Sequence, residues 1–318
     1  MARPARLLCA VALWLAGCAT TTNPAPPEAG TTVPPGQDAR LFAYNAALGA
    51  LFGGVGALLN GDEDPALLRL GRGAGWGAVG GTVAYGGKWM AGEIRTRERL
   101  AFALPARLTH DVGASIVENA SRGRPPLDRL AAYVGFVRLD VRPASGDVQA
   151  RLLPVSAAVF ASVLVGDNGD LHLGHSLAFG TPVFVGDGSR SAPVFGGQAD
   201  GYGGFGTVYL NRENSDFYGL AAHELIHVLQ HREMAYTAAL YARLDEPLRR
   251  SGAYRALARW VYLDDPVLPL GIYYVVTGGD VRGPCRYDNW FEREAEAFGK
   301  RRAVGVCPLH GRGHQRAE

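Results

Sequence analysis

Two long uncharged stretches dominate the first third of the chain. Residues 41–61 contain no charged side chain, residues 73–87 contain none, and the polar segment 62–72 separates them. Small residues recur at every fourth position of each stretch, namely Gly49, Gly53, Ala57, Gly73, Gly77 and Gly81. This spacing predicts two helices whose backbones approach closely, as helices do in lipid. We therefore predict a glycine-rich apolar helical hairpin over residues 41–92.

Two environments are compatible with this hairpin. The first stretch is long enough to span a bilayer, whereas the second is short unless Lys88 extends its ammonium group to the interface. The alternative is a closely packed helix pair inside a soluble fold. Glycine is unfavourable in an isolated aqueous helix, so both alternatives require a tight packing partner.

From residue 132 the pattern becomes strand-like. Residues 133–142 alternate between polar and apolar towards their end, and short apolar runs at 171–185, 193–195 and 206–211 lie between Gly, Asp and Ser turns. Residues 152–165 fit either a buried strand or a helix. Helical patterns at 92–106, 108–120, 220–229 and 233–262 surround these runs. The succession predicts an α+β fold in which a twisted sheet leads into the helix at 220–229.

That helix carries the clearest chemical signal, His223-Glu224-Leu225-Ile226-His227. Histidines four residues apart on one helical face can bind a single metal ion. Glu224 lies about 100° around the helix from His223, where its carboxylate can take a proton from a metal-bound water. Two surface histidines that match by chance are the alternative. The aliphatic neighbours of the motif leave such a helix little solvent-facing surface.

A catalytic zinc site needs a third protein ligand and an open position for water. The predicted helix 289–299 offers Glu292 and Glu296, four residues apart, so that one can bind the metal while the other supports a ligand histidine. Glu294 is the rival ligand if the helix is rotated, and a solvated acidic face is the alternative for the cluster. His231 is poorly placed because it lies about 12 Å along the helix from His223.

The two motifs together resemble the gluzincin class of zinc metallopeptidases, in which H-E-x-x-H on one helix is followed by E-x-x-[AS]-D on another. The segment 292–296 matches with one departure, because Glu296 stands where the class has Asp. The resemblance covers residues 215–298 and implies a zincin-like domain over residues 93–318. It also implies one Zn²⁺ ion held by His223, His227 and Glu292, with Glu296 accepting a hydrogen bond from the other ring N–H of a ligand histidine.

The same resemblance implies hydrolysis of peptide bonds in a protein or peptide substrate, with Glu224 as the general base. It further implies that the strand at 206–211 forms a sheet edge that pairs with extended peptides, an interior strand being the alternative. Tyr273, Tyr274 and Tyr287 are candidate donors to the oxyanion. A structural envelope lipoprotein with a non-catalytic or absent zinc site is the second functional hypothesis.

The N-terminus indicates export. Arg3 and Arg6 precede an apolar run at 7–15 that ends in Leu-Ala-Gly before Cys18, so residues 1–17 are predicted to be a signal peptide. The sequence around Cys18 resembles a bacterial lipobox, which implies lipidation of this residue; an ordinary signal peptide is the alternative. Residues 18–40 contain few large apolar side chains and are predicted to be a flexible tether. Because Ala19 is not an inner-membrane retention signal of the Asp type, we expect a lipid-anchored protein of the bacterial cell envelope, at the outer membrane and facing the periplasm or the surface.

Two cysteines remain after this processing, Cys285 and Cys307. In an oxidising compartment they are predicted to form one disulfide, two free thiols being the alternative.

Several other functions are disfavoured. A net charge of +2 without a basic cluster argues against nucleic-acid binding. No Gly-x-Ser-x-Gly elbow or phosphate-binding loop is present. His172 and His175 are expected on opposite faces of a strand, which argues against a second metal site.

Overall fold

The computed structural model describes residues 37–61, 64–166, 169–187, 200–240, 248, 250–262 and 290–299. The predictions for the signal peptide, Cys18, most of the tether, the strand at 193–195, the three tyrosines and the pair Cys285 and Cys307 lie outside the described residues.

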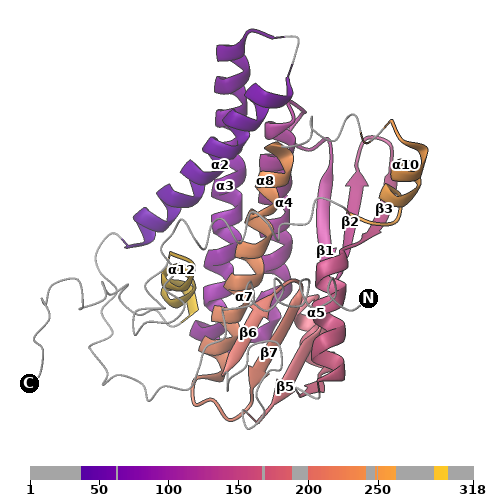
Figure 1. Cartoon of the computed structure of the whole chain (residues 1–318). Helices are drawn as coiled ribbons and strands as arrows, with labels where there is room; N and C mark the ends of the chain where they lie inside the picture. Colours follow the sequence, from indigo (N-terminus) through magenta and orange to yellow (C-terminus); the bar gives the residue numbers. More distant parts are fainter. Residues whose placement is uncertain are drawn as a thin grey trace, which may run out of the picture.

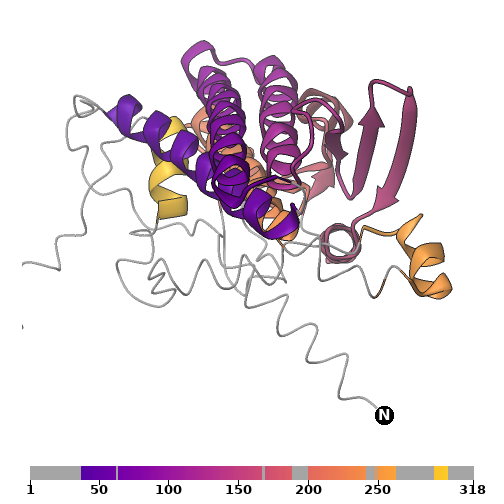
Figure 2. The same cartoon turned by 90° about the horizontal axis from the view of Figure 1, so that it is seen from above.

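Three long helices form one layer of the molecule. They are α2 (Gln37–Asn60), α3 (Ala66–Arg97) and α4 (Ala103–Ser121), with a short 3-10 helix η1 (Leu100–Phe102) before α4. Figure 1 shows α2 and α3 as an antiparallel hairpin, and Figure 2 shows α3 and α4 side by side when seen from above. The helical hairpin therefore begins before residue 41 and ends after residue 92. Its second helix, α3, packs against α4 and α7, so the hairpin is part of the same core as the rest of the fold.

Glycines bring these helices into backbone contact. A Cβ atom on Gly77 would clash with the carbonyl oxygen of Gly49, and a Cβ atom on Gly81 would clash with that of Asn45. On another face of α3, a Cβ on Gly80 would lie 2.7 Å from the carbonyl oxygen of Gly113 in α4. Among the described residues, α2 is the one helix long and apolar enough to cross a membrane.

The packing predicts opposite effects for two glycines of the same helix. Gly77→Ala should lower the free energy of unfolding by about 1–3 kcal/mol, because the added methyl overpacks the α2–α3 contact. Gly75→Ala should raise it by up to about 1 kcal/mol, since nothing lies within 4 Å of its Cβ position and alanine favours the helix. Chemical denaturation of the two variants measures the difference. Equal destabilisation by both would contradict the packing.

Two small sheets accompany the helices, so the fold is mixed α+β. β1 (Leu130–Val134), β2 (Val137–Arg142) and β3 (Asp147–Leu152) form an antiparallel meander. β4 (Asp170–Leu171), β5 (Val183–Gly186), β6 (Gly201–Gly204) and β7 (Thr207–Asn211) form a sheet in the order β4-β5-β7-β6, with β5 and β7 parallel. α5 (Pro154–Val165) is a helix, which settles the ambiguity of the apolar run 152–165.

Two predictions from the strand-like region are wrong. Residues 173–179 form helix α6 (Leu173–Phe179) instead of a strand, because His172 caps its start by accepting from the backbone N–H of His175 at 3.1 Å. Gly180, at φ +62°, ends it in the left-handed region that glycine adopts without strain. β7 is an interior strand, paired with β5 on one side and with β6 on the other, so the predicted peptide-binding edge does not lie at 206–211.

The helix α7 (Phe217–Glu233) lies at the centre of the fold. Asp216 caps its start by accepting from the N–H of Gly219 at 3.0 Å, and every residue from Gly219 to Glu233 is buried. One side of α7 packs on β6 and β7, and another packs on α3 and α4. Beyond it follow α8 (Ala235–Leu240), α10 (Gly252–Ala258) and α12 (Trp290–Gly299), of which α12 packs against α7 and α3.

A buried ion cluster fastens the meander to α4. Arg138 of β2 is fully buried and binds Glu118 of α4 at 2.8 Å and Asp140 at 2.9 Å. Burial raises the pKa of Glu118, but the guanidinium groups of Arg138 and Arg122 outweigh burial and lower this pKa to about 2. Because the folded pKa is depressed, the ionised carboxylate stabilises the fold above its unfolded pKa. That stabilisation is lost as the pH falls towards 2.

We therefore expect Glu118→Gln to lower the free energy of unfolding at pH 7, by a few kcal/mol at most, and to have less effect at pH 3. Urea denaturation at the two pH values measures this. The exposed Glu213, replaced by Gln, is the control and should change stability little at either pH. An effect of Glu118→Gln that does not shrink in acid would contradict the ion-pair explanation.

Candidate metal centre

Helix α7 presents two imidazoles to the same point. The Nε2 atoms of His223 and His227 lie 3.0 Å apart, and both side chains are buried. Helix α12 adds a carboxylate from 65 residues further along the chain. Glu292 Oε2 lies 3.3 Å from His223 Nε2 and 3.5 Å from His227 Nε2. The three ligand-type atoms thus form a compact triangle, the one group of His, Cys, Asp and Glu with this geometry in the described part of the chain.

This triangle has the dimensions of one face of a tetrahedral zinc site. Zinc–nitrogen and zinc–oxygen bonds of about 2.0–2.1 Å place tetrahedral ligand atoms about 3.3 Å from one another. The separations here are 3.0, 3.3 and 3.5 Å. Two imidazoles and one carboxylate are also a ligand set that zinc takes in catalytic sites, with the fourth position left for water. The three residues therefore fit a zinc ion.

The electrostatics favour positive charge at the same point. Burial lowers the pKa of His227, but the carboxylate of Glu292 outweighs burial and raises this pKa to about 9. Burial raises the pKa of Glu292, and the two imidazoles outweigh it and hold this pKa well below the usual range. A buried carboxylate that stays ionised between two imidazoles calls for a cation, either a proton or a metal ion.

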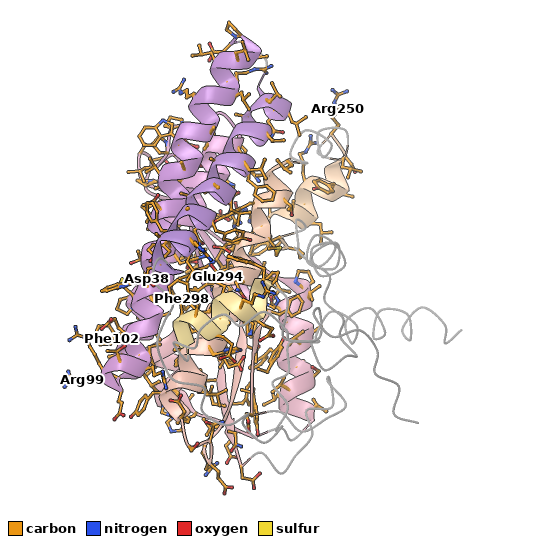
Figure 3. The ribbon with its side chains drawn as sticks, turned by 90° about the vertical axis from the view of Figure 1, so that its left-hand side faces the viewer. Asp38, Arg99, Phe102, Arg250, Glu294 and Phe298 are labelled. Carbon is orange, nitrogen blue, oxygen red and sulfur yellow. The ribbon has the colours of Figure 1, made fainter. Side chains whose placement is uncertain are left out.

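Glycines allow α12 to reach this position. A Cβ on Gly299 would lie 2.7 Å from the Cβ of His223, so the end of α12 rests directly on α7. A Cβ on Gly92 of α3 would lie 3.2 Å from the carbonyl oxygen of Phe298. Figure 3 shows α12 in yellow, with Glu294 and Phe298 labelled, beside the hairpin helices. The apolar face of α12, which includes Phe291 and Ala295, is buried in the core.

Gln230 orients one of the imidazoles. Its Oε1 lies 2.8 Å from His227 Nδ1, so the ring donates from Nδ1 and keeps Nε2 available for a metal. Its Nε2 donates to the backbone oxygen of Phe291 and to Glu294 Oε2, both at 2.9 Å. Gln230 therefore ties α7 to α12 next to the ligands. Reasoning from the sequence did not assign it this role; the signal was its place three residues after His227, on the same helical face.

Glu294 points away from the imidazoles. It accepts a hydrogen bond from Lys88 Nζ at 2.8 Å and from Asn45 Nδ2 at 2.9 Å, which brings α3 and α2 to α12. Lys88 also pairs with Glu233 of α7 at 2.7 Å and donates to Asn45 Oδ1 at 2.9 Å. Burial lowers the pKa of Lys88, but Glu233 and Glu294 outweigh burial and raise it. The rival ligand thus belongs to a charged network that links the hairpin to both site helices.

Glu296 lies beside His223 without forming a hydrogen bond to it. Its Oε1 is 3.9 Å from His223 Nδ1, which is longer than a hydrogen bond, and its side chain is 24% exposed. Glu296, predicted to support a ligand histidine, is therefore on the expected side of the His223 imidazole but too far from it to accept a hydrogen bond.

Glu224 lies between α7 and the sheet. It is fully buried, and a Cβ on Gly201 of β6 would lie 2.5 Å from its Oε1. A Cβ on Gly203 would clash with the Glu224 backbone. The glycine-rich strand β6 therefore makes room for Glu224, a function of this segment that the sequence alone did not suggest.

The remaining histidines of the region have other contacts. His231 Nδ1 accepts from the backbone N–H of Phe205 at 3.0 Å, and burial, with a contribution from His227, lowers its pKa to about 3. The rings of His172 and His175 stack at 3.8 Å, so the expectation that they face opposite sides is wrong. No carboxylate or thiol completes a metal site with this pair among the described residues.

Comparisons with known proteins add no relative. No family model matches the chain, and no curated protein or solved structure is significantly similar to it. The interpretation of the site therefore depends on its own geometry.

The geometry separates two glutamates of α12. Glu292→Ala should weaken zinc binding by more than about a hundredfold, because it removes a ligand atom. Glu296→Ala should weaken it by about tenfold or less, since Glu296 makes no hydrogen bond to His223. Competition with a fluorescent zinc chelator gives both affinities. A larger loss for Glu296→Ala than for Glu292→Ala would reverse the assignment.

Proposed function

We propose that the protein is a zinc-dependent peptidase, anchored in the bacterial cell envelope by a lipid on Cys18. The observation that supports a zinc enzyme is the triangle of His223, His227 and Glu292, whose ligand atoms are spaced as they are around a zinc ion. Glu224, the proposed general base, directly follows His223 in the sequence. The resemblance of the two motifs to the gluzincin class is consistent with this proposal. The location in the envelope is supported by the N-terminal sequence alone.

Each residue has a distinct part in this proposal. Zinc, when bound, would polarise the scissile carbonyl and lower the pKa of the attacking water. Glu224 accepts the proton of that water and returns it to the leaving amine, as a general base and then a general acid. Gln230 holds His227 in the tautomer that leaves Nε2 to the metal. The Glu292 carboxylate would hold the ion together with the two imidazoles and offset part of its charge.

The sheet offers a place for the peptide. β6 pairs with β7 on one side and is the last strand of its sheet in the described residues. Gly201 and Gly203 of β6 contact Glu224 on one face of the sheet, so a peptide paired with the outer edge of β6 would lie beside the strand that contacts the general base. Main-chain hydrogen bonds to such an edge bind extended peptides with little dependence on sequence. We therefore propose β6, in place of β7, as the substrate-binding edge.

A structural zinc site in an envelope lipoprotein is the second candidate. The burial of His223, His227 and Glu224 favours it, since a site that keeps water away contributes stability and no turnover. In that case zinc removal would lower the free energy of unfolding, and the zinc-bound protein would hydrolyse no peptide.

Glu224→Gln separates the two candidates. A peptidase should lose about a hundredfold or more of its rate on unfolded casein, because glutamine cannot accept the proton. Zinc content should stay at one ion per chain, since Glu224 is not a ligand. The exposed Glu98, replaced by Gln, is the control for the amide substitution. Unchanged turnover in Glu224→Gln would refute the mechanism. Zinc bound to a wild-type protein that cuts no peptide would favour the structural candidate.

A further inference from the structure

The outer surface of α3 and α4 has a polarity opposite to that of a typical soluble helix layer. Between residues 73 and 92 of α3 the one charged side chain is Lys88, and it is fully buried. In residues 103–117 of α4 the ionisable side chains are Arg107, His110 and Asp111, and all three are buried. Neither helix therefore exposes a charge along these stretches.

The buried charges of α4 point towards the rest of the fold. Arg107 donates to the backbone oxygens of Phe179 and Tyr133, and Asp111 pairs with Arg232 of α7. His110 lies 3.4 Å from Glu233, also on α7. These contacts fix which side of α4 faces inward. In Figure 2 no described element covers the side of α3 and α4 that faces away from α7.

Apolar side chains occupy that opposite side. The seam between the two helices is marked by Met90 and Thr109, whose Sδ and Oγ1 atoms lie 3.6 Å apart. On both sides of the seam large side chains are 36–51% exposed: Trp76, Val79 and Trp89 of α3, and Leu108 and Val112 of α4. We call these five residues the α3–α4 face. Large exposed apolar side chains that gather on one side of a helix layer mark an interaction site.

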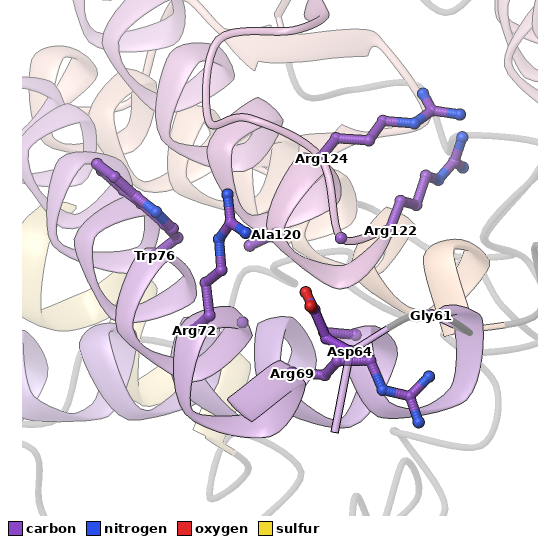
Figure 4. A pocket seen from close by; sticks show the side chains of 11 residues that line it. Gly61, Asp64, Arg69, Arg72, Trp76, Ala120, Arg122 and Arg124 are labelled. Atoms are coloured by element: carbon purple, nitrogen blue, oxygen red, sulfur yellow. The ribbon is translucent and has the colours of Figure 1, made fainter. Parts of the chain in front are cut away.

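A cavity with an excess of arginine lies at one end of this face. Trp76 lines both the face and the cavity, which has a volume of about 290 Å³. Its charged lining consists of Arg69, Arg72, Arg122, Arg124 and Asp64. Figure 4 shows Arg72 extending from α3 towards Ala120 of α4.

Two of these arginines have no partner to neutralise them. Arg122 pairs with Glu118 at 3.1 Å, and Arg124 lies 3.9 Å from Asp128. Arg69 and Arg72 form no ion pair or hydrogen bond within the described chain, and Arg69 Nε and Nη1 are shielded from solvent. Such guanidinium groups suit a phosphate anion.

The combination selects one kind of partner. A charge-free face with tryptophans, ending at unpaired arginines, matches a bilayer surface with an apolar interior and anionic headgroups. A spanning hairpin fits less well, because Lys88 and its carboxylate partners on α7 and α12 would have to enter the hydrocarbon with it. A soluble protein partner matches less well, because such interfaces have a polar rim, and α3 and α4 expose no charge along residues 73–92 and 103–117.

We propose that the α3–α4 face lies on a phospholipid membrane, with Trp76 and Trp89 at the level of the acyl chains and a headgroup phosphate in the arginine-lined cavity. The proposal stands on this surface and is independent of the metal centre.

Quenching by brominated acyl chains tests the contact directly in the full chain reconstituted into vesicles. Trp76→Phe and Trp89→Phe should each remove part of the bromine-dependent quenching, because these rings contact lipid. Trp260→Phe should remove none, since this exposed ring lies beyond α10, away from the face. Quenching that is the same in wild type, Trp76→Phe and Trp89→Phe overturns the proposal.

A charge-insertion pair tests the face without removing a tryptophan. Leu108→Glu/Val112→Glu should abolish the quenching that depends on Trp89, since two carboxylates cannot enter the acyl layer. Leu164→Glu/Val165→Glu makes the same change on exposed positions of α5 and should leave it intact. Circular dichroism and an unchanged thermal unfolding midpoint verify folding. If the face variant instead turns a dimer into a monomer in detergent, the face binds a second copy and the proposal fails.

The binding of a lipid headgroup in the arginine-lined cavity is tested by comparing anionic and zwitterionic vesicles. Wild-type quenching should be stronger in phosphatidylglycerol than in phosphatidylcholine vesicles, and Arg69→Gln/Arg72→Gln should remove this difference. Arg250→Gln/Arg259→Gln, on exposed arginines near α10, should preserve it. The headgroup assignment is overturned if wild type shows no preference for phosphatidylglycerol vesicles. If inorganic phosphate then binds wild type and does not bind Arg69→Gln/Arg72→Gln, the cavity is a site for a free anion.

Discussion

The fully buried ammonium group of Lys88 constrains the arrangement of four helices. A charge without access to water is tolerated only where opposite charges and hydrogen-bond acceptors surround it. Asn45 on α2, Glu233 on α7 and Glu294 on α12 supply them, each within 2.9 Å. Removing Lys88 would leave two buried carboxylates without their shared cation, and removing Asn45 would leave the ammonium group one acceptor short. The network therefore fixes α12 against α7, and this fixed contact brings Glu292 to the two histidines.

The glycine-rich hairpin has a structural role in the same constraint. Backbone contact between α2 and α3 at Gly49 and Gly77 lets Asn45 reach Lys88, and Gly92 lets α12 approach α3. Small residues at helical spacing therefore allow close helix packing inside the protein itself. Stability near the metal centre depends on helices that contribute no ligand to it.

The sequence predicts the local part of this site well and the distant part less well. Two histidines on one side of a helix follow from the 3.6-residue period, whereas the position of Glu292 depends on how α12 docks, which residue spacing does not determine. Gln230 and Gly201 acquire their roles from neighbours far along the chain. The helix α6 was mistaken for a strand because its apolar residues resemble one, while the capping by His172 and Gly180 decides the outcome.

The central claim is that one zinc ion lies between α7 and α12, and X-ray anomalous scattering from crystals grown with zinc tests it most directly. We expect a single strong peak at the zinc absorption edge, about 2.0–2.1 Å from His223 Nε2, His227 Nε2 and a Glu292 oxygen. A peak elsewhere, such as at His172 and His175, or no peak between the two helices at saturating zinc, would contradict it.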